Sequence, residues 1–233
     1  MVRPGRIVAA LWHPAGQSAV TAGPARAGAA RWHMMGVMPA SPASLTEQQV
    51  LDLYEKTGAL MRGHFRLTSG LHSDVYLQSA LVLQHPRHAE ALGAALAAAL
   101  DGDGVQTVLA PAMGGILVAH EVARALQARA LFTEREEGVM RLRRGFALAR
   151  GERCLVVEDV VTTGGSTREV VACVEAHGGV VVGVGSLVDR SGGAAVFPMK
   201  RAALARVEAS TWPPAACPLC TAGGRAVKPG SRA

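Results

Sequence analysis

Cysteine is scarce in this sequence, and long apolar runs are absent. The four cysteines, at positions 154, 173, 217 and 220, are too few and too unevenly spaced for the disulfide framework of a small secreted protein. A reducing, cytoplasmic location is therefore expected. The longest apolar stretches, such as Ala91–Leu100, reach about half of the roughly 20 residues that a membrane-spanning helix needs, so we expect no membrane partner. The 233 residues, 49% of them hydrophobic, suffice for one domain with a sizeable core.

Acidic residues are missing from the first 46 positions, and this absence accounts for most of the net charge of +6. Four arginines lie in that region, and three further basic residues lie at 222–233. Residues 47–221 contain 17 basic and 18 acidic residues and are nearly neutral. Because a nucleic-acid-binding surface normally needs a concentrated basic face, we expect no nucleic-acid partner.

Residues 1–44 are rich in Ala, Gly, Pro and Arg and show neither a helical nor a strand period. This composition predicts a disordered extension and resembles an organelle transit peptide. A start placed too far upstream is the alternative, because Met34, Met35 and Met38 directly precede the first folding signal.

Regular hydrophobic patterns begin at Thr46, which forms a capping-box pattern with Gln49 and predicts a helix ending near Gly58. Alternating residues from 64 to 83 then predict two extended segments with a turn at Ser69-Gly70. Beyond them, we predict strands at 105–110, 130–134, 153–158 and 180–188, helices at 86–100, 115–127 and 167–176, and a mobile loop or hairpin at 138–151. This alternation is typical of an α/β fold with a mainly parallel sheet and helices on both faces.

Acids, hydroxyls and glycines are concentrated after the apolar stretch Cys154–Val157. Glu158 and Asp159 end the predicted strand, and the run 162–167, Thr-Thr-Gly-Gly-Ser-Thr, leads into the predicted helix. Ligands of parallel sheets bind beyond the carboxyl ends of the strands. Glycines let main-chain amides approach an anion, and the helix N-terminus favours phosphate. The acids suit hydroxyl groups or a divalent cation, so the pattern predicts a sugar phosphate bound with Mg²⁺.

Two common nucleotide-binding motifs are missing. The Walker A lysine is absent, and no G-x-G-x-x-G follows a predicted strand. The plainer alternative is that Glu158 and Asp159 cap a solvated strand end and that Gly164 and Gly165 form an ordinary turn. The combination of two acids, four hydroxyls and two glycines between a strand and a helix favours the phosphate site.

The run Val156–Thr167 resembles the phosphoribosyl pyrophosphate signature of type I phosphoribosyltransferases. The segments Gly63–Gln78, Ala110–Ile116 and Leu187–Arg190 resemble, in order and spacing, the orotate phosphoribosyltransferases of that family. The resemblance covers about residues 47 to 230. After the extension at 1–44, it implies an N-terminal helix and hood at 45–85, a phosphoribosyltransferase core at 86–212 and a C-terminal tail with the Cys-x-x-Cys motif at 213–233.

The resemblance implies that orotate displaces pyrophosphate from carbon 1 of phosphoribosyl pyrophosphate and yields orotidine 5′-monophosphate in pyrimidine synthesis. It places Glu158 and Asp159 on the ribose hydroxyls, with Asp159 as the catalytic group that assists the developing cation. Mg²⁺ would be held through the substrate, without a firm protein ligand. The residues that would bind phosphoribosyl pyrophosphate are Glu158, Asp159, Val160, Val161, Thr162, Thr163, Gly164, Gly165 and Ser166.

Orotate would contact Thr162 and Arg190, because the planar fork of an arginine can bond both oxygens of a carboxylate. The alternative for Arg190 is a surface arginine paired with Asp189. The resemblance also implies a homodimer whose sites are shared across the interface.

The sequence departs from the family at several basic positions. The family's catalytic loop carries an Arg-Lys pair, a further Lys and a His, whereas this chain keeps only Arg135 as a cationic and candidate catalytic residue. Thr68 and Gly114 stand where the family has lysines. The pyrophosphate must then be held differently, by Arg135 or by the arginines at 141, 143 and 144, from this or a neighbouring subunit. These three arginines could equally form a solvated hairpin face.

Cys217-Pro218-Leu219-Cys220 is half of a zinc site by spacing. A closed site would need further ligands from elsewhere in the chain or from a second subunit. A reducible surface pair or a tight turn is the alternative. The histidines show no ligand spacing, and we interpret His64 and His72 as substrate-pocket or structural residues.

Two other functions remain open on this sequence. One is a phosphoribosyltransferase for a purine or another base. The other is a non-catalytic regulator that senses phosphoribosyl pyrophosphate and binds nucleic acid. The absence of the catalytic-loop lysines is compatible with a non-catalytic regulator. The nearly neutral charge of residues 47–221 argues against it, because nucleic-acid binding needs a basic face.

Overall fold

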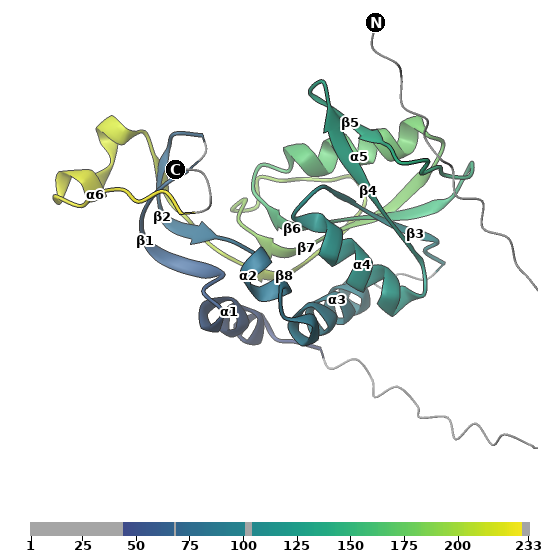
Figure 1. The fold of residues 1–233 in the computed structure, drawn as a ribbon, viewed down its shortest axis with the longest axis horizontal. Coiled ribbons are helices and arrows are strands. Elements are labelled where there is room, and N and C mark those ends of the chain that lie inside the picture. Colours follow the sequence, from purple (N-terminus) through teal and green to yellow (C-terminus); the bar gives the residue numbers. More distant parts are fainter. Residues whose placement is uncertain (1–43, 68, 101–103, 230–233) are drawn as a thin grey trace, which may run out of the picture. The chain divides into compact units, whose positions relative to one another are not determined.

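A computed structural model describes residues 44–67, 69–100 and 104–229 (Figure 1). The predictions for the extension before residue 44 and for Thr68 lie outside the described residues. None of the helices in the described ranges combines the length and the apolar character needed to cross a bilayer.

The core is a six-stranded sheet in the order β5-β4-β3-β6-β7-β8. All neighbouring strands are parallel except β4 and β5, which form an antiparallel hairpin at one edge. The strands are β3 (Thr107–Pro111), β4 (Arg129–Glu136), β5 (Val139–Leu142), β6 (Arg153–Val161), β7 (Val180–Asp189) and β8 (Lys200–Arg206). The mainly parallel sheet predicted from the sequence is therefore confirmed.

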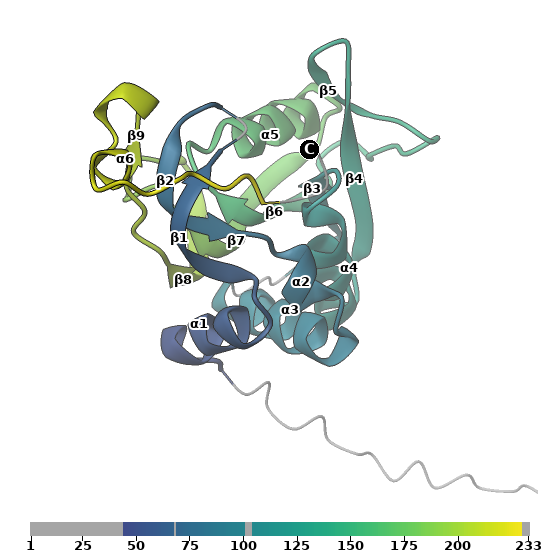
Figure 2. The ribbon, with the colours of Figure 1, turned by 60° about the vertical axis from the view of Figure 1, so that its left-hand side comes forward.

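Helices cover both faces of this sheet (Figure 2). One face packs against α3 (Pro86–Leu100) and α4 (Gly115–Leu126), and the other packs against α5 (Gly165–Ala176). Side chains along β6 alternate between the two faces of the sheet. Leu155 and Val157 pack in the core under α3 and α4. Cys154 and Val156 pack in the core under α5. This two-sided burial explains the uninterrupted apolar run at the start of β6.

The N-terminal hood begins with α1 (Glu47–Lys56), whose Thr46 and Gln49 form the predicted capping box. Its sheet has the order β1-β2-β9 and is antiparallel, with β1 at Leu60–Arg66, β2 at His72–Leu77 and β9 at Thr211–Trp212. The short helix α2 (Ala80–Leu83) then leads to α3. After β9, the chain forms the single-turn helix α6 (Pro218–Thr221) beside the hood.

Several elements differ from the sequence predictions. The extended pattern predicted up to residue 83 stops at Leu77, because Ala80–Leu83 is helical. The first hood strand begins at Leu60, before the predicted alternation. The hairpin alternative for 138–151 is confirmed by the pairing of β5 with β4. Strand β8 was not predicted, since its sequence, Lys-Arg-Ala-Ala-Leu-Ala-Arg, lacks the β-branched residues typical of strands.

Candidate active site

The carboxyl ends of β6 and β7 lie side by side and bring the predicted site residues together. Val161, the last residue of β6, is in register with Asp189, the last residue of β7. The amide of Arg190 donates to the carbonyl of Val161 at 2.8 Å. The acids and the hydroxyl-rich loop therefore leave the sheet next to Arg190, at the edge where ligands of parallel sheets bind.

The loop from 162 to 166 ends at the N-terminus of α5. Gly164 precedes the helix with φ of 75°, a left-handed conformation that side chains rarely adopt. A Cβ on Gly164 would lie 3.0–3.1 Å from Arg168, Phe197 and Ala195, so this glycine is also closely packed. Thr162 and Thr163 are exposed, and the first amides of α5 have no acceptor within the helix. The loop thus offers hydroxyl and amide donors to an anion, as the sequence predicts.

The two carboxylates at the end of β6 are held by hydroxyl groups. The Thr167 hydroxyl donates to Glu158 Oε2, and Ser79 hydrogen-bonds the Asp159 side chain. The phenol of the fully buried Tyr54 donates to Ser79 Oγ at 3.2 Å. Tyr54 and Ser79 therefore position Asp159 from the hood. The sequence did not reveal this role, because Tyr54 fits the apolar face of α1 and nothing in the pattern singles out Ser79.

Burial raises the pKa of both carboxyls. For Glu158 the pKa rises from 4.5 to about 7, chiefly through desolvation, although the Thr167 hydrogen bond lowers it. Desolvation also raises the pKa of Asp159, against hydrogen bonds from Ser79 and from main-chain amides. Neither carboxyl forms an ion pair with a basic residue in the described ranges. Within the described part of the chain, the two carboxyls therefore have no direct cationic partner.

This donor set fits the Mg²⁺ that the resemblance implies. Carboxylates and hydroxyls are the oxygen groups that Mg²⁺ and its hydrated shell accept. Hydroxyl and amide donors for a phosphate lie in the loop that follows directly. Glu158 and Asp159 can therefore face a sugar whose pyrophosphate carries the ion, without either being a dedicated metal ligand.

Gly114 lies close to the carboxylate of Asp159. It precedes α4, and a Cβ at this position would lie 2.8 Å from Asp159 Oδ1 and 3.0 Å from Oδ2. Because real Cβ atoms do not approach so closely, any side chain here must displace the carboxylate. The family's lysine at this position therefore cannot be added to this chain with Asp159 left in place.

We expect Gly114→Ala to lower kcat about tenfold or more, because the new methyl group displaces Asp159 and small misplacements at reacting centres are costly. Steady-state turnover measures this effect. His120→Ala, which removes an exposed side chain from the same helix, is the control and should retain turnover. Wild-type turnover in Gly114→Ala would contradict the tight approach.

A stability measurement tests the raised pKa of Glu158. Between pH 4.5 and about 7 the folded chain binds more protons at this carboxyl than the unfolded chain, so its ionisation lowers stability as the pH rises. Glu158→Gln should therefore raise the free energy of unfolding above pH 7, by up to about 3 kcal/mol, and have little effect below pH 4.5. Thermal unfolding across this range measures the difference. The exposed Glu175→Gln is the matched control, and equal shifts in both variants would contradict the prediction.

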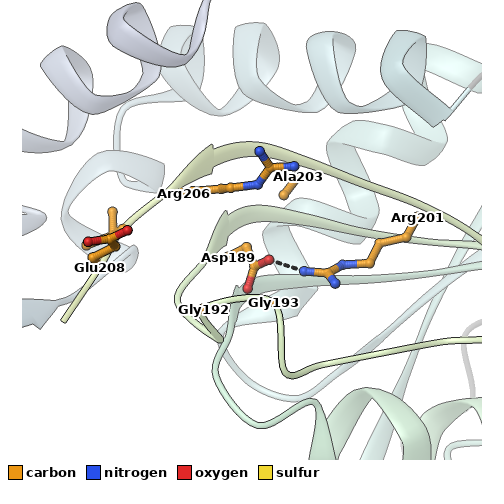
Figure 3. Close-up of a pocket in the computed structure, with 8 residues that line it drawn as sticks. Asp189, Gly192, Gly193, Arg201, Ala203, Arg206 and Glu208 are labelled. Atoms are coloured by element: carbon orange, nitrogen blue, oxygen red, sulfur yellow. Dashed lines mark hydrogen bonds and ion pairs between the residues drawn. The ribbon is translucent and has the colours of Figure 1, made fainter. Parts of the chain in front are cut away.

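Arg190 is half-buried, and desolvation lowers the pKa of its guanidinium while the charge of Asp74 raises it. The alternative that Arg190 pairs with Asp189 is wrong. The buried Asp189 carboxylate instead accepts from Arg201, and it also accepts from the amide of Ser191 at 2.8 Å (Figure 3). Arg190 has no ion pair among the described residues, so its guanidinium is available to an anionic ligand.

A cavity of about 440 Å³ lies at the carboxyl ends of β7 and β8. Its lining comes from the end of β7, the following loop, β8 and the two residues after β8 (Figure 3): Asp189, Gly192, Gly193, Arg201, Ala203, Arg206, Val207 and Glu208. The Asp189–Arg201 pair belongs to this lining (Figure 3). Arg201 also donates to the carbonyl of Ala195 at 2.5 Å, so β8 is tied to the loop after Arg190. This cavity contains none of the predicted site residues, and we assign it a supporting role.

The basic residues considered for pyrophosphate are all paired with acids. Arg135 contacts Glu169 of α5 at 2.6 Å. Arg144 binds Glu134 with two hydrogen bonds of 2.7 and 2.8 Å, while the guanidiniums at 141 and 143 lie 3.5 and 3.3 Å from Glu136. These contacts describe a charged surface on the β4–β5 hairpin, which projects from the sheet (Figure 1). A pyrophosphate would have to displace a carboxylate from one of these arginines.

Comparisons with known proteins identify the family of this chain. The model of the phosphoribosyl transferase domain family matches residues 80–197. The orotate phosphoribosyltransferase of Pelotomaculum thermopropionicum is 56% identical over 188 residues, which cover 81% of this chain and 99% of that protein. The orotate phosphoribosyltransferase of Acidithiobacillus ferrooxidans is 54% identical over 197 residues, which cover 81% of this chain and 98% of that protein.

Solved structures lead to the same family. The crystal structure of orotate phosphoribosyltransferase from Aeropyrum pernix is similar to 68% of this chain over 93% of its own length, with a TM-score of 0.56 and 26% sequence identity. Val156–Thr167 and Leu187–Arg190, two of the segments that carry the resemblance, meet at the carboxyl ends of the paired strands β6 and β7. Together with the high identity to full-length relatives, these observations show that the chain belongs to the orotate phosphoribosyltransferase family.

Proposed function

We propose that this protein transfers the 5-phosphoribosyl group of phosphoribosyl pyrophosphate to orotate, giving orotidine 5′-monophosphate and pyrophosphate in the synthesis of pyrimidine nucleotides. The observation that carries the choice of base is Arg190. It is half-buried, has no ion pair among the described residues, and follows β7 beside the loop at 158–167. Orotate carries a carboxylate, which a planar guanidinium can bind through both oxygens.

The loop at 160–166 binds the 5′-phosphate in this proposal. The first main-chain amides of α5 have no acceptor within the helix, and the helix dipole favours an anion at this end. Thr162, Thr163 and Ser166 add hydroxyl donors. Gly164 permits the left-handed turn that brings these donors together.

Glu158 and Asp159 accept hydrogen bonds from the ribose hydroxyls. As the bond from carbon 1 to the pyrophosphate oxygen breaks, positive charge develops on the ribose, and a buried carboxylate stabilises it strongly. Asp159 has this role because Ser79 and main-chain amides favour its ionised form, even though burial raises its pKa. The bond from carbon 1 to the orotate ring nitrogen then forms, and the proton of that nitrogen leaves with the departing pyrophosphate.

Thr162 and Arg190 hold orotate so that its ring nitrogen faces carbon 1 of the ribose. When bound with the substrate, Mg²⁺ supplies positive charge to the departing pyrophosphate. Arg135 remains the protein's candidate cation for that group. Its present partner, Glu169, lies on α5 and would have to release it.

The proposed enzyme is a homodimer in the cytoplasm. In a homodimer, the charged β4–β5 hairpin of one subunit would lie near the active site of the other. Its arginines, which pair with Glu134 and Glu136 in the single chain, would then be close to the pyrophosphate. The four cysteines are free, in agreement with a reducing, cytoplasmic compartment.

A spectrophotometric assay tests the proposal. The purified protein with orotate, phosphoribosyl pyrophosphate and Mg²⁺ should consume orotate, and removal of Mg²⁺ with EDTA should stop the reaction. An unchanged orotate absorbance in the complete mixture would contradict the proposed activity.

A further inference from the structure

Four metal-binding side chains converge in the hood. They are His64, His72, Cys217 and Cys220, and their ligand atoms all lie within 4.8 Å of one another. The sequence interpretation separated these histidines from the Cys pair. The folded chain brings them together because the C-terminal segment returns to the hood sheet, where α6 lies beside β1 and β2 (Figure 2).

Four of the six separations between these atoms are close to the edges of a tetrahedral zinc site, and none of the six exceeds 4.8 Å. Zinc bonds of about 2.0–2.1 Å to nitrogen and about 2.3 Å to sulfur imply edges of about 3.3 Å between nitrogens and about 3.6 Å from nitrogen to sulfur. His64 Nε2 lies 2.9 Å from His72 Nδ1 and 3.4 and 3.7 Å from the two sulfurs. The Cys220 sulfur lies 3.3 Å from His72 Nδ1. All four distances agree with these edges to within roughly half an ångström.

Local structure directs each ligand to this point. The register of β1 and β2 shifts between Arg62 and Phe65, and this bulge contains His64. His72 begins β2 opposite Arg66. Cys217 caps α6 and Cys220 lies one turn later, so the C-x-x-C spacing places both sulfurs on one side of the turn.

The contacts of His64 are difficult to explain without a metal. Its Nε2 faces one imidazole nitrogen and two thiol sulfurs. A proton on His64 Nε2 can form a hydrogen bond to only one of these three atoms. A metal cation at the centre of the cluster can bind all of them together with Nε2.

The C-terminal segment has few attachments to the hood besides this cluster. Between residues 213 and 229 only Cys217 is buried, with 1% of its surface exposed, so the alternative of a reducible surface pair is wrong for this residue. Two main-chain hydrogen bonds of 2.8 Å join Val227 to His64 and Arg66. Segments that bury so little apolar surface usually need a disulfide or a metal to remain folded.

We propose that His64, His72, Cys217 and Cys220 bind one Zn²⁺ ion in a closed structural site. Four protein ligands leave no position for a substrate, so the ion would stabilise the fold and take no part in the transfer. It would fasten the C-terminal segment to the hairpin of β1 and β2. That hairpin carries Asp74, whose charge acts on Arg190, and leads to Ser79, which holds Asp159.

The test is the metal content of the full-length protein, purified under reducing conditions without added chelator. We expect about one zinc per chain by plasma mass spectrometry. Replacement with Co²⁺ should give the intense visible bands of a tetrahedral site together with thiolate-to-cobalt charge transfer. Cys220→Ser and Cys217→Ser should lose the zinc and the charge-transfer band, and should lower the unfolding temperature.

Matched controls separate this site from other thiols and imidazoles. Cys173→Ala removes a buried thiol outside the cluster, and His85→Ala removes a histidine outside it, so both should retain the zinc. A metal-free wild-type protein that takes up neither Zn²⁺ nor Co²⁺ would overturn the proposal. Retention of zinc by the double variant Cys217→Ser/Cys220→Ser would also overturn it. These readouts do not depend on catalysis, so they are independent of the proposed activity.

Discussion

Replacing Asp159 with asparagine should lower kcat about 100- to 1,000-fold while leaving the protein folded. Asparagine has the same shape, but it cannot supply negative charge to a ribose that becomes cationic in the transition state. Burial raises the pKa of Asp159, which means that the fold gains nothing from ionising this carboxyl. We therefore expect an unfolding temperature equal to or higher than that of the wild type. Steady-state kinetics and thermal unfolding on the same preparation measure both effects.

Ser79→Ala provides the companion measurement for Asp159. It removes the hydroxyl that joins Asp159 to Tyr54 but leaves the carboxylate, so a smaller loss of kcat is expected. Because Ser79 acts through Asp159, the double variant should be no slower than Asp159→Asn alone. Wild-type turnover in Asp159→Asn would contradict the role assigned to this residue.

Arg190→Ala should lower kcat/KM for orotate about 30- to 1,000-fold, corresponding to about 2–4 kcal/mol. The variant leaves the carboxylate of orotate without its partner in a partly desolvated site. The KM for phosphoribosyl pyrophosphate should change little, because the loop that holds its phosphate is separate. Initial-rate measurements with each substrate varied in turn distinguish the two effects.

Arg190→Lys and Arg150→Ala are the matched variants for this prediction. A lysine keeps the charge but loses the planar fork, so only part of the orotate affinity should return. Arg150 is exposed in the loop before β6, and its removal should leave kcat/KM unchanged. If Arg190→Ala uses orotate as well as the wild type does, orotate binds elsewhere.

Local patterns in the sequence predicted most of the core. The capping box at Thr46, the apolar run of β6 and the helix that begins at Pro86 depend on neighbours a few residues away, and all three are confirmed. The candidate site loop at 158–167 could be located for the same reason, since its acids, hydroxyls and glycines are contiguous. Strand β8 was not, because its alanines are placed by pairing with β7 rather than by strand propensity.

The parts that depend on distant segments could not be predicted. Ser79 and Tyr54 reach Asp159 only after the hood has packed onto the core. Similarly, His64 meets Cys217 across 153 positions of sequence, and no spacing rule connects them. The pairing of Asp189 with Arg201 also depends on β8, and it releases Arg190 for a ligand.

The choice of base is the central claim, and a panel of acceptor bases tests it most directly. The measurement is kcat/KM of the wild-type protein with orotate, uracil, adenine and hypoxanthine, each with phosphoribosyl pyrophosphate and Mg²⁺. We predict that orotate is converted to orotidine 5′-monophosphate with equimolar release of pyrophosphate. The bases that lack a carboxylate should be at least about 100-fold poorer, since they leave Arg190 unpaired. Preference for a purine, or no transfer to any base, would contradict the assignment.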